Sequence, residues 1–404
     1  MSKKQLVILL ILYLVTSGVA YAGFAALGKR GGTMVTTTDQ GSTQPTAEPV
    51  AQLLNINPQE PKDQQCPLNG QMYTQTERQA WEKRRPLAVM IENSPDARPQ
   101  SGTTRADVVF EAMAEGGVTR FMALYYCDVQ REDITLAPIR SAREYFFKIA
   151  SGFNRPLYVH VGGANTPGPA DALGQIADAG WNQANDMNQF SIGYPTFVRD
   201  YSRLGADREI ATEHTMVTTT EKLWKIADKR LWTNTSPPVT KTVKGVKQTT
   251  PGKDWKDGFT PWNFADGEPE KGSVGTISFE FWTGYNNYAV TWQYDSQTNT
   301  YKRILAGQPH LDLNTNQQIA VKNAVVMFAE EKGPIDEHKH LLYTLVNSTG
   351  DALVFQNGVA IKAKWSKKDR EAPLLFLDEK GKPITFVRGP IWISLVGKKT
   401  PVTY

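Results

Sequence analysis

The sequence predicts an α+β protein, in which a mixed α/β domain over residues 66–232 is followed by a β-rich domain over residues 274–404. Short apolar runs rich in Val, Ile, Phe and Tyr alternate with helical segments in the first of these parts. Strand and turn patterns fill the second part. An apolar N-terminal segment precedes both, which predicts a transmembrane or signal helix ahead of the folded domains.

The N-terminal segment, residues 1–30, predicts export. Lys3 and Lys4 precede an apolar run, Leu6–Leu27, and about 20 apolar residues are enough for a helix to cross a bilayer. The triplet Ala20-Tyr21-Ala22 also fits the pattern that signal peptidase cleaves. The run continues past that point, which favours a retained anchor. We therefore expect a single-pass protein of the cell membrane with extracellular domains, or a secreted protein if the signal is cleaved.

The next segment and the cysteines fit the same location. Residues 31–65 are rich in Thr, Gln, Pro, Gly and Ser, which predicts a flexible linker. The only two cysteines are Cys66 and Cys127, and an oxidising compartment favours a disulfide between them over two separate buried thiols. The pair lacks C-x-x-C spacing, so no metal site is predicted. Residues 233–273, with Pro and Lys-rich turns, are expected to connect the domains.

Individual elements follow from local patterns. The capping boxes Ser141–Glu144 and Thr218–Glu221 are expected to open helices that end near Ser151 and Arg230. A third helix is predicted over 169–179. The expected strands of the first domain span 86–91, 107–110, 121–126 and 157–161, and a hairpin joins 288–294 to 300–303.

Charged residues gather where these strands end, over Arg84–Phe146 and just beyond. Arg140 and Arg143 flank Ser141, the expected N-cap of a helix. A helix N-terminus and two guanidinium groups suit a carboxylate, phosphate or sulfate. Such a cleft would also hold Arg120, positioned by carboxylates. The remaining candidates of this group are Glu92, Asn93, Glu111 and Glu115. The sequence equally allows these arginines to pair with the carboxylates and only stabilise the fold.

Histidines offer an alternative chemistry. His160 precedes Gly162 and Gly163, and His214 follows Glu213. A histidine beside a carboxylate can act as a general acid and base, although a hydrogen-bonded core histidine gives the same pattern. Aromatic residues of the expected hairpin suit either a carbohydrate platform or cross-strand packing. They include Tyr285, Tyr288, Trp292 and Tyr301.

Several motifs in order resemble the bacterial YerB-like family. They are Arg85–Gly102, Glu115–Phe121, Pro138–Arg143, Tyr158–Gly163 and Glu213–Met216, with later segments that resemble its C-terminal domain. The resemblance implies the family's two domains and an exported, often lipid-anchored protein, but no activity. This sequence has no cysteine at a lipidation position, which favours a transmembrane anchor.

The charge balance limits the partners that we expect. The chain has 45 Lys and Arg against 41 Asp and Glu, with no basic stripe, so nucleic-acid binding is not favoured. We expect a membrane-anchored extracellular protein that binds an anionic cell-envelope component, such as peptide carboxylates or wall phosphates, in an Arg-lined cleft. The alternative is a hydrolase or transferase that acts on envelope polymers. No cofactor is predicted.

Overall fold

The computed structural model describes residues 52–243, 246–269 and 274–404, so the expected helix over 1–30 lies outside the described residues. No helix among the described residues is long and apolar enough to span a membrane. The fold is rich in strands, as predicted, and the α-helices of the described residues all end before residue 230.

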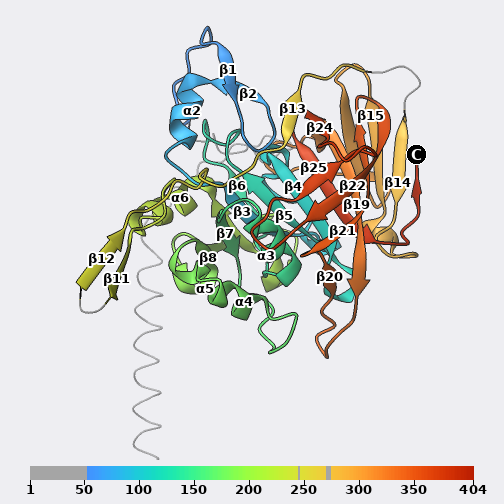
Figure 1. Ribbon diagram of the computed structural model, residues 1–404. Coiled ribbons are helices and arrows are strands. Elements are labelled where there is room, and N and C mark those ends of the chain that lie inside the picture. Colours follow the sequence, from blue (N-terminus) through green and yellow to red (C-terminus); the bar gives the residue numbers. More distant parts are fainter. Residues whose placement is uncertain (1–51, 244–245, 270–273) are drawn as a thin grey trace, which may run out of the picture. The chain divides into compact units, whose positions relative to one another are not determined.

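The main sheet combines strands from both ends of the chain (Figure 1). Its order is β23-β22-β21-β19-β25-β4-β5-β3-β7-β8, and β20 pairs with β19. The early strands are β3 (Leu87–Glu92), β4 (Val108–Met113), β5 (Thr119–Tyr125), β7 (Leu157–His160) and β8 (Asp186–Asn188). The late strands are β19 (Asn323–Lys332), β20 (Leu342–Thr344), β21 (Ser348–Gln356), β22 (Val359–Lys367), β23 (Leu375–Leu377) and β25 (Ile391–Gly397). The four strands expected in the first domain are therefore confirmed.

Strand β25 joins the two predicted domains within one sheet. It runs parallel to β19 on one side and to β4 on the other, with Ile393 opposite Phe110. Its side chains are almost all buried, as expected for a parallel strand covered on both faces. The sheet thus crosses the expected boundary between 66–232 and 274–404, and the division into two domains stays a prediction.

The α-helices of the described residues precede the second sheet in sequence. They are α2 (Gln75–Trp81), α3 (Glu144–Ser151), α4 (Ala172–Asp178), α5 (Gln189–Ile192) and α6 (Thr220–Lys229). Helix α6 is capped by Thr219, one residue later than expected. Helix α3 begins at Glu144 with Arg143 as its N-cap and without a side-chain cap, so the expected N-cap at Ser141 is wrong. The cause is Ala142, which forms a β-bridge to Gly163 and keeps its segment extended.

A second sheet carries the predicted hairpin. It contains β14 (Thr276–Phe279), β15 (Val290–Asp295), β16 (Thr300–Leu305), β17 (Gln308–Pro309), β18 (Ala320–Val321) and β26 (Val402–Thr403). Tyr288, Trp292 and Tyr301 are buried. These three rings pack in the core beneath the hairpin, so they do not form an exposed platform.

Parts of the segments before and between the predicted domains pack against the fold. Strand β1 (Lys62–Gln65) pairs with β2 (Met72–Thr74), and Leu53 N donates to the carbonyl of Arg131. A flexible linker is therefore wrong for residues 52–65, and its earlier part lies outside the described residues. In 233–273, Trp255 packs edge-on against Tyr126.

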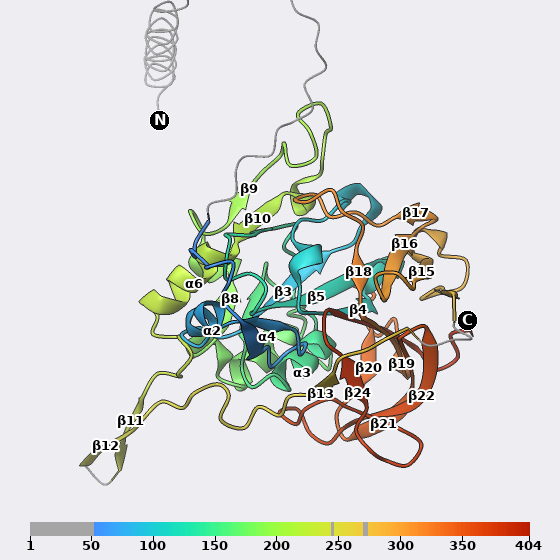
Figure 2. The ribbon, with the colours of Figure 1, turned by 90° about the horizontal axis from the view of Figure 1, so that it is seen from above.

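The remaining short strands belong to this connection and to a small third sheet. Strand β13 (Asn263–Ala265) pairs in parallel with β24 (Thr385–Val387). The hairpin of β11 (Val239–Val243) and β12 (Val246–Thr250) projects away from the rest of the fold (Figures 1 and 2). The third sheet has the order β6 (Thr135–Leu136), β10 (Met216–Thr219), β9 (Val198–Arg199).

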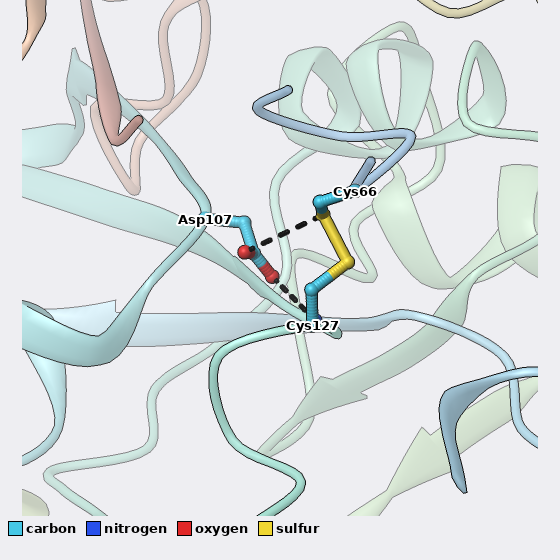
Figure 3. A group of neighbouring side chains, drawn as sticks. All are labelled: Cys66, Asp107 and Cys127. Carbon is cyan, nitrogen blue, oxygen red and sulfur yellow. Dashed lines mark hydrogen bonds between the residues drawn. A yellow bond between two sulfur atoms is a disulfide. The ribbon is translucent and has the colours of Figure 1, made fainter. Parts of the chain in front are cut away.

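The predicted disulfide between Cys66 and Cys127 is present and lies beside the buried carboxylate of Asp107 (Figure 3). Asp107 Oδ2 accepts hydrogen bonds from the backbone N–H of Cys127 at 3.0 Å and of Tyr126 at 2.7 Å. Asn69 Nδ2 donates to Oδ1 at 2.8 Å. Burial, with repulsion from Asp128, raises the pKa of Asp107 to about 7. The three residues have the spacing of metal ligands, but their sulfur atoms are joined to each other.

Candidate functional site

Three of the predicted site residues converge in what we call the Arg140 cluster: Glu92, Arg140 and His214. Glu92 Oε1 lies 3.4 Å from Arg140 Nε, and Glu92 Oε2 lies 2.8 Å from His214 Nδ1. The Glu92 carboxylate is nearly buried, at the end of β3. One carboxylate therefore holds a guanidinium and an imidazole that come from distant parts of the sequence.

Backbone hydrogen bonds place these side chains. Arg140 N donates to the carbonyl of Met90 at 2.9 Å, which aligns the segment after the β6 region with the end of β3. Ile139 N donates to the carbonyl of Met216 at 2.9 Å. This contact brings in the 3-10 turn Thr212–His214, which carries the imidazole. The cluster is thus fixed by main-chain pairing and not by its own charges alone.

The outer side of the cluster faces solvent. About a third of the Arg140 side chain is exposed (30%), and among the described residues its terminal nitrogens make no hydrogen bond. Burial of the remainder lowers the pKa of Arg140, and the charge of Glu92 opposes this shift. Glu213 is exposed beside the cluster, and its pKa is lowered by a backbone hydrogen bond and by His214 and Arg140.

A second group, Arg120, Arg143 and Glu115, is closed by internal pairing. Arg143 Nε donates to Glu115 Oε2 at 2.8 Å, and a terminal nitrogen of Arg143 contacts the other carboxylate oxygen. Arg120 Nη2 lies 3.6 Å from Glu115, and Nη1 donates to the carbonyl of Ser141 at 3.1 Å. Both arginines are buried, which lowers their pKa values. Their charge is directed at Glu115 rather than at solvent.

A third group, which we call the Glu111 network, joins the early and late parts of the chain. Glu111 Oε2 accepts from Arg303 Nη2 at 2.7 Å and from Trp392 Nε1 at 3.0 Å. Its other oxygen accepts from Thr119 Oγ1 at 2.9 Å and from Asn93 Nδ2 at 3.4 Å. The side chains of Glu111 and Arg303 are both 0% exposed. This network is a structural contact and not part of a surface site.

His160 is also closed off. The ring is fully buried, with Nε2 2.6 Å from Asp186 Oδ1 and Nδ1 2.7 Å from the carbonyl oxygen of Gly162. Both ring nitrogens have partners, so His160 is a hydrogen-bonded core residue. Gly162 has φ +56°, and an added Cβ would lie 2.9 Å from the ring of Phe190. Gly163 pairs with Ala142 through the bridge described above.

The pattern of the sequence did not reveal the partners of these groups. Arg303 lies in β16 in phase with the buried Tyr301 and Leu305, and a charged residue at such a position signals a buried ion pair. This signal gives no indication of the partner, because Glu111 is 192 positions away. Asp186 likewise approaches His160 only through the pairing of β7 with β8.

Comparisons with known proteins agree with the resemblance in the sequence. The model of the DUF3048 N-terminal domain, a domain of unknown function, matches residues 72–233, and the DUF3048 C-terminal domain model matches 277–393. The Bacillus subtilis protein described as "Putative lipoprotein YerB" is 30% identical over 341 residues, covering 84% of this chain and 88% of that protein.

The crystal structure of YerB from Bacillus subtilis matches with a TM-score of 0.63 and 27% identity, over 85% of this chain and 100% of that one. The chain therefore belongs to the YerB-like family, which is defined by the DUF3048 N- and C-terminal domains.

Proposed function

We propose that this protein is a membrane-anchored extracellular protein that binds an anionic component of the cell envelope at the Arg140 cluster. The observation that supports this is the asymmetric pairing of Arg140. Glu92 lies on its Nε side, while no hydrogen bond to the two terminal nitrogens occurs among the described residues and 30% of the side chain is exposed. Two parallel N–H donors on a guanidinium suit a carboxylate or a phosphate.

The remaining arginines of the expected cleft have a different role in this proposal. Arg120 and Arg143 share the carboxylate of Glu115, so they stabilise the segment that carries Arg140. Arg140 alone contacts the ligand. The expected contribution of a helix N-terminus is removed from the proposal, because α3 begins at Glu144 and not beside Ser141.

The location rests on sequence and on the relative. The YerB relative is described as a lipoprotein, which associates that protein with a membrane. Both cysteines of this chain are joined in the disulfide, so neither is a free thiol for acylation. The apolar run Leu6–Leu27 is long enough to serve as a single-pass anchor instead.

The test reverses the charge at Arg140. The Arg140→Glu variant and a control, Lys362→Glu, on the exposed face of β22, are sedimented with purified wall material. We expect the Arg140 variant to lose binding and the control to keep it, with circular dichroism unchanged for both. Equal binding by wild type and Arg140→Glu overturns the proposal.

A second candidate function, a hydrolase or transferase, is favoured by the contact between Glu92 and His214. A carboxylate on Nδ1 orients an imidazole so that Nε2 can accept a proton, and no hydrogen bond to Nε2 occurs among the described residues. His160 is excluded from this role by its two internal partners.

Turnover separates the two functions. Wild type and His214→Ala are incubated with purified wall polymers, and newly released reducing ends and amino groups are measured. Release by wild type that the His214 variant loses, with binding retained, supports catalysis. Binding without any release supports the binding protein.

A further inference from the structure

Two exposed aromatic rings contact segments that are hydrogen-bonded to, or carry, members of the Arg140 cluster. Phe190, in the short helix α5, is 76% exposed, and Tyr201, which follows β9, is 55% exposed. Exposed rings of this size leave apolar surface in water, and rings that gather at one place often mark a binding surface. Both rings are tied to segments that carry members of the cluster.

Phe190 is held against the segment of Arg140. Its ring lies over Gly162, where the positive φ of +56° favours glycine and a Cβ would approach Phe190 Cε2 to 2.9 Å. The carbonyl of Gly162 accepts from Ala142 N at 2.9 Å, and Val161 N donates to the carbonyl of Arg140 at 3.1 Å. Asn188 Oδ1 accepts from the backbone N–H of both Gly162 and Phe190, which fixes the main chain of Phe190 relative to Gly162.

Tyr201 is held against the segment of His214. Its hydroxyl lies 3.3 Å from Thr212 Oγ1, in the turn that contains Glu213 and His214. Arg199 donates to the carbonyl of Thr212 and to Thr215 Oγ1, which attaches β9 to the same turn. The ring is therefore placed by hydrogen bonds, although more than half of its surface is exposed.

Sugars match this combination of groups. A pyranose presents C–H groups on its faces, which pack on an aromatic ring, and hydroxyls on its edge, which bond to planar polar side chains. Arginine, glutamate and histidine supply such polar groups here. A purely inorganic anion would use Arg140 but would gain nothing from the rings, and a hydrophobic peptide would leave the charges of the cluster without partners.

We propose that Phe190 and Tyr201 are stacking subsites for sugar rings, so that the ligand of the Arg140 cluster is an acidic oligosaccharide. This inference rests on the proposed function, because the acidic group of the sugar is bound by Arg140. The rings select the saccharide, and the guanidinium selects its charge.

The experiment measures three probes by isothermal titration calorimetry with the protein lacking residues 1–51, because the Arg140 cluster and both rings lie in the described residues after 51. The probes are a hyaluronan hexasaccharide, which alternates acidic and neutral sugars, neutral chitotetraose, and pentameric polyphosphate. The variants are Phe190→Ala, Tyr201→Ala and Tyr201→Phe. The control is Tyr404→Ala, which removes an exposed ring that packs on Phe355.

We expect each alanine variant at Phe190 and Tyr201 to weaken hyaluronan binding roughly 2- to 12-fold, the range for an aromatic contact. Polyphosphate binding should not change, and Tyr404→Ala should behave as wild type. Tyr201→Phe keeps the ring but loses the hydroxyl contact to Thr212, so it should bind hyaluronan more tightly than Tyr201→Ala. Chitotetraose should bind more weakly than hyaluronan, because it lacks the acidic group.

Other outcomes separate this inference from the function on which it rests. If polyphosphate binds through Arg140 and neither oligosaccharide binds, the stacking subsites are wrong and the anion-binding function stands. Equal losses for polyphosphate and hyaluronan in the aromatic variants also overturn the subsites. If no probe binds and wall material does not bind, both proposals fail.

Discussion

The Glu111 network and the Arg140 cluster both pair a glutamate with an arginine. The first stabilises the fold from inside, and the second is a candidate binding site at the surface. In the first, Glu111 and Arg303 are fully buried, and Trp392 packs on the guanidinium at 4.4 Å. In the second, Glu92 lies 3.4 Å from Arg140, whose side chain is 30% exposed. A buried charge must be matched inside the protein, whereas an exposed one can be matched by a ligand. Burial, rather than residue type, distinguishes a structural ion pair from a candidate binding group.

The largest effect is expected from breaking the buried pair. Arg303→Met leaves Glu111 as an uncompensated buried charge, which should lower the free energy of unfolding by roughly 3–5 kcal/mol. Urea denaturation measures this loss. The double variant Glu111→Gln/Arg303→Met removes both charges and should recover part of the stability. A loss below about 1 kcal/mol for the single variant would contradict a structural role.

The Cys66–Cys127 disulfide also joins distant segments of the chain, in this case by a covalent bond. Replacing Cys66 and Cys127 by serine opens a closed loop of 61 residues, for which chain entropy gives a loss of about 4 kcal/mol. Thermal unfolding of the double variant, with wild type in dithiothreitol as the matched comparison, measures the effect. Wild-type stability in the variant would show that the link between these segments is not needed.

A pH-dependent effect is expected from Asp107, a buried carboxylate with neutral hydrogen-bond donors. Its pKa is raised from 3.8 to about 7, so the folded state binds the proton more tightly than the unfolded state. Its stabilising contribution is therefore complete below about pH 4 and is lost as the pH rises to about 7. Asp107→Asn should flatten the pH dependence of unfolding in this window. An unchanged slope in the variant would refute the shift.

The sequence predicted the parts of this fold that depend on local patterns. The four early strands and the β15–β16 hairpin follow from apolar runs and turn residues. The start of α3 could not be predicted, because the bridge between Ala142 and Gly163 prevailed over the capping preference of Ser141. A bridge between distant residues leaves no trace in the local pattern.

The candidate site also has features that depend on local patterns and features that depend on distant residues. Charges at strand ends singled out Glu92 and Arg140, which the structure places 3.4 Å apart, and their role in binding stays a prediction. The sequence could not separate the surface cluster from the buried network, because that difference depends on Arg303 and Trp392 from the other end of the chain. Likewise, the contact of the Phe190 ring with Gly162 depends on the pairing of segments distant in sequence.

One paired measurement tests the contrast between the two regions most directly. The free energy of unfolding and the binding of purified wall material are both measured for Arg140→Met and Arg303→Met. For Arg140→Met we predict unfolding within about 1 kcal/mol of wild type, because the side chain is partly exposed, together with loss of binding. A stability loss as large as that of Arg303→Met, or undiminished binding, would show that Arg140 is a structural residue like Arg303.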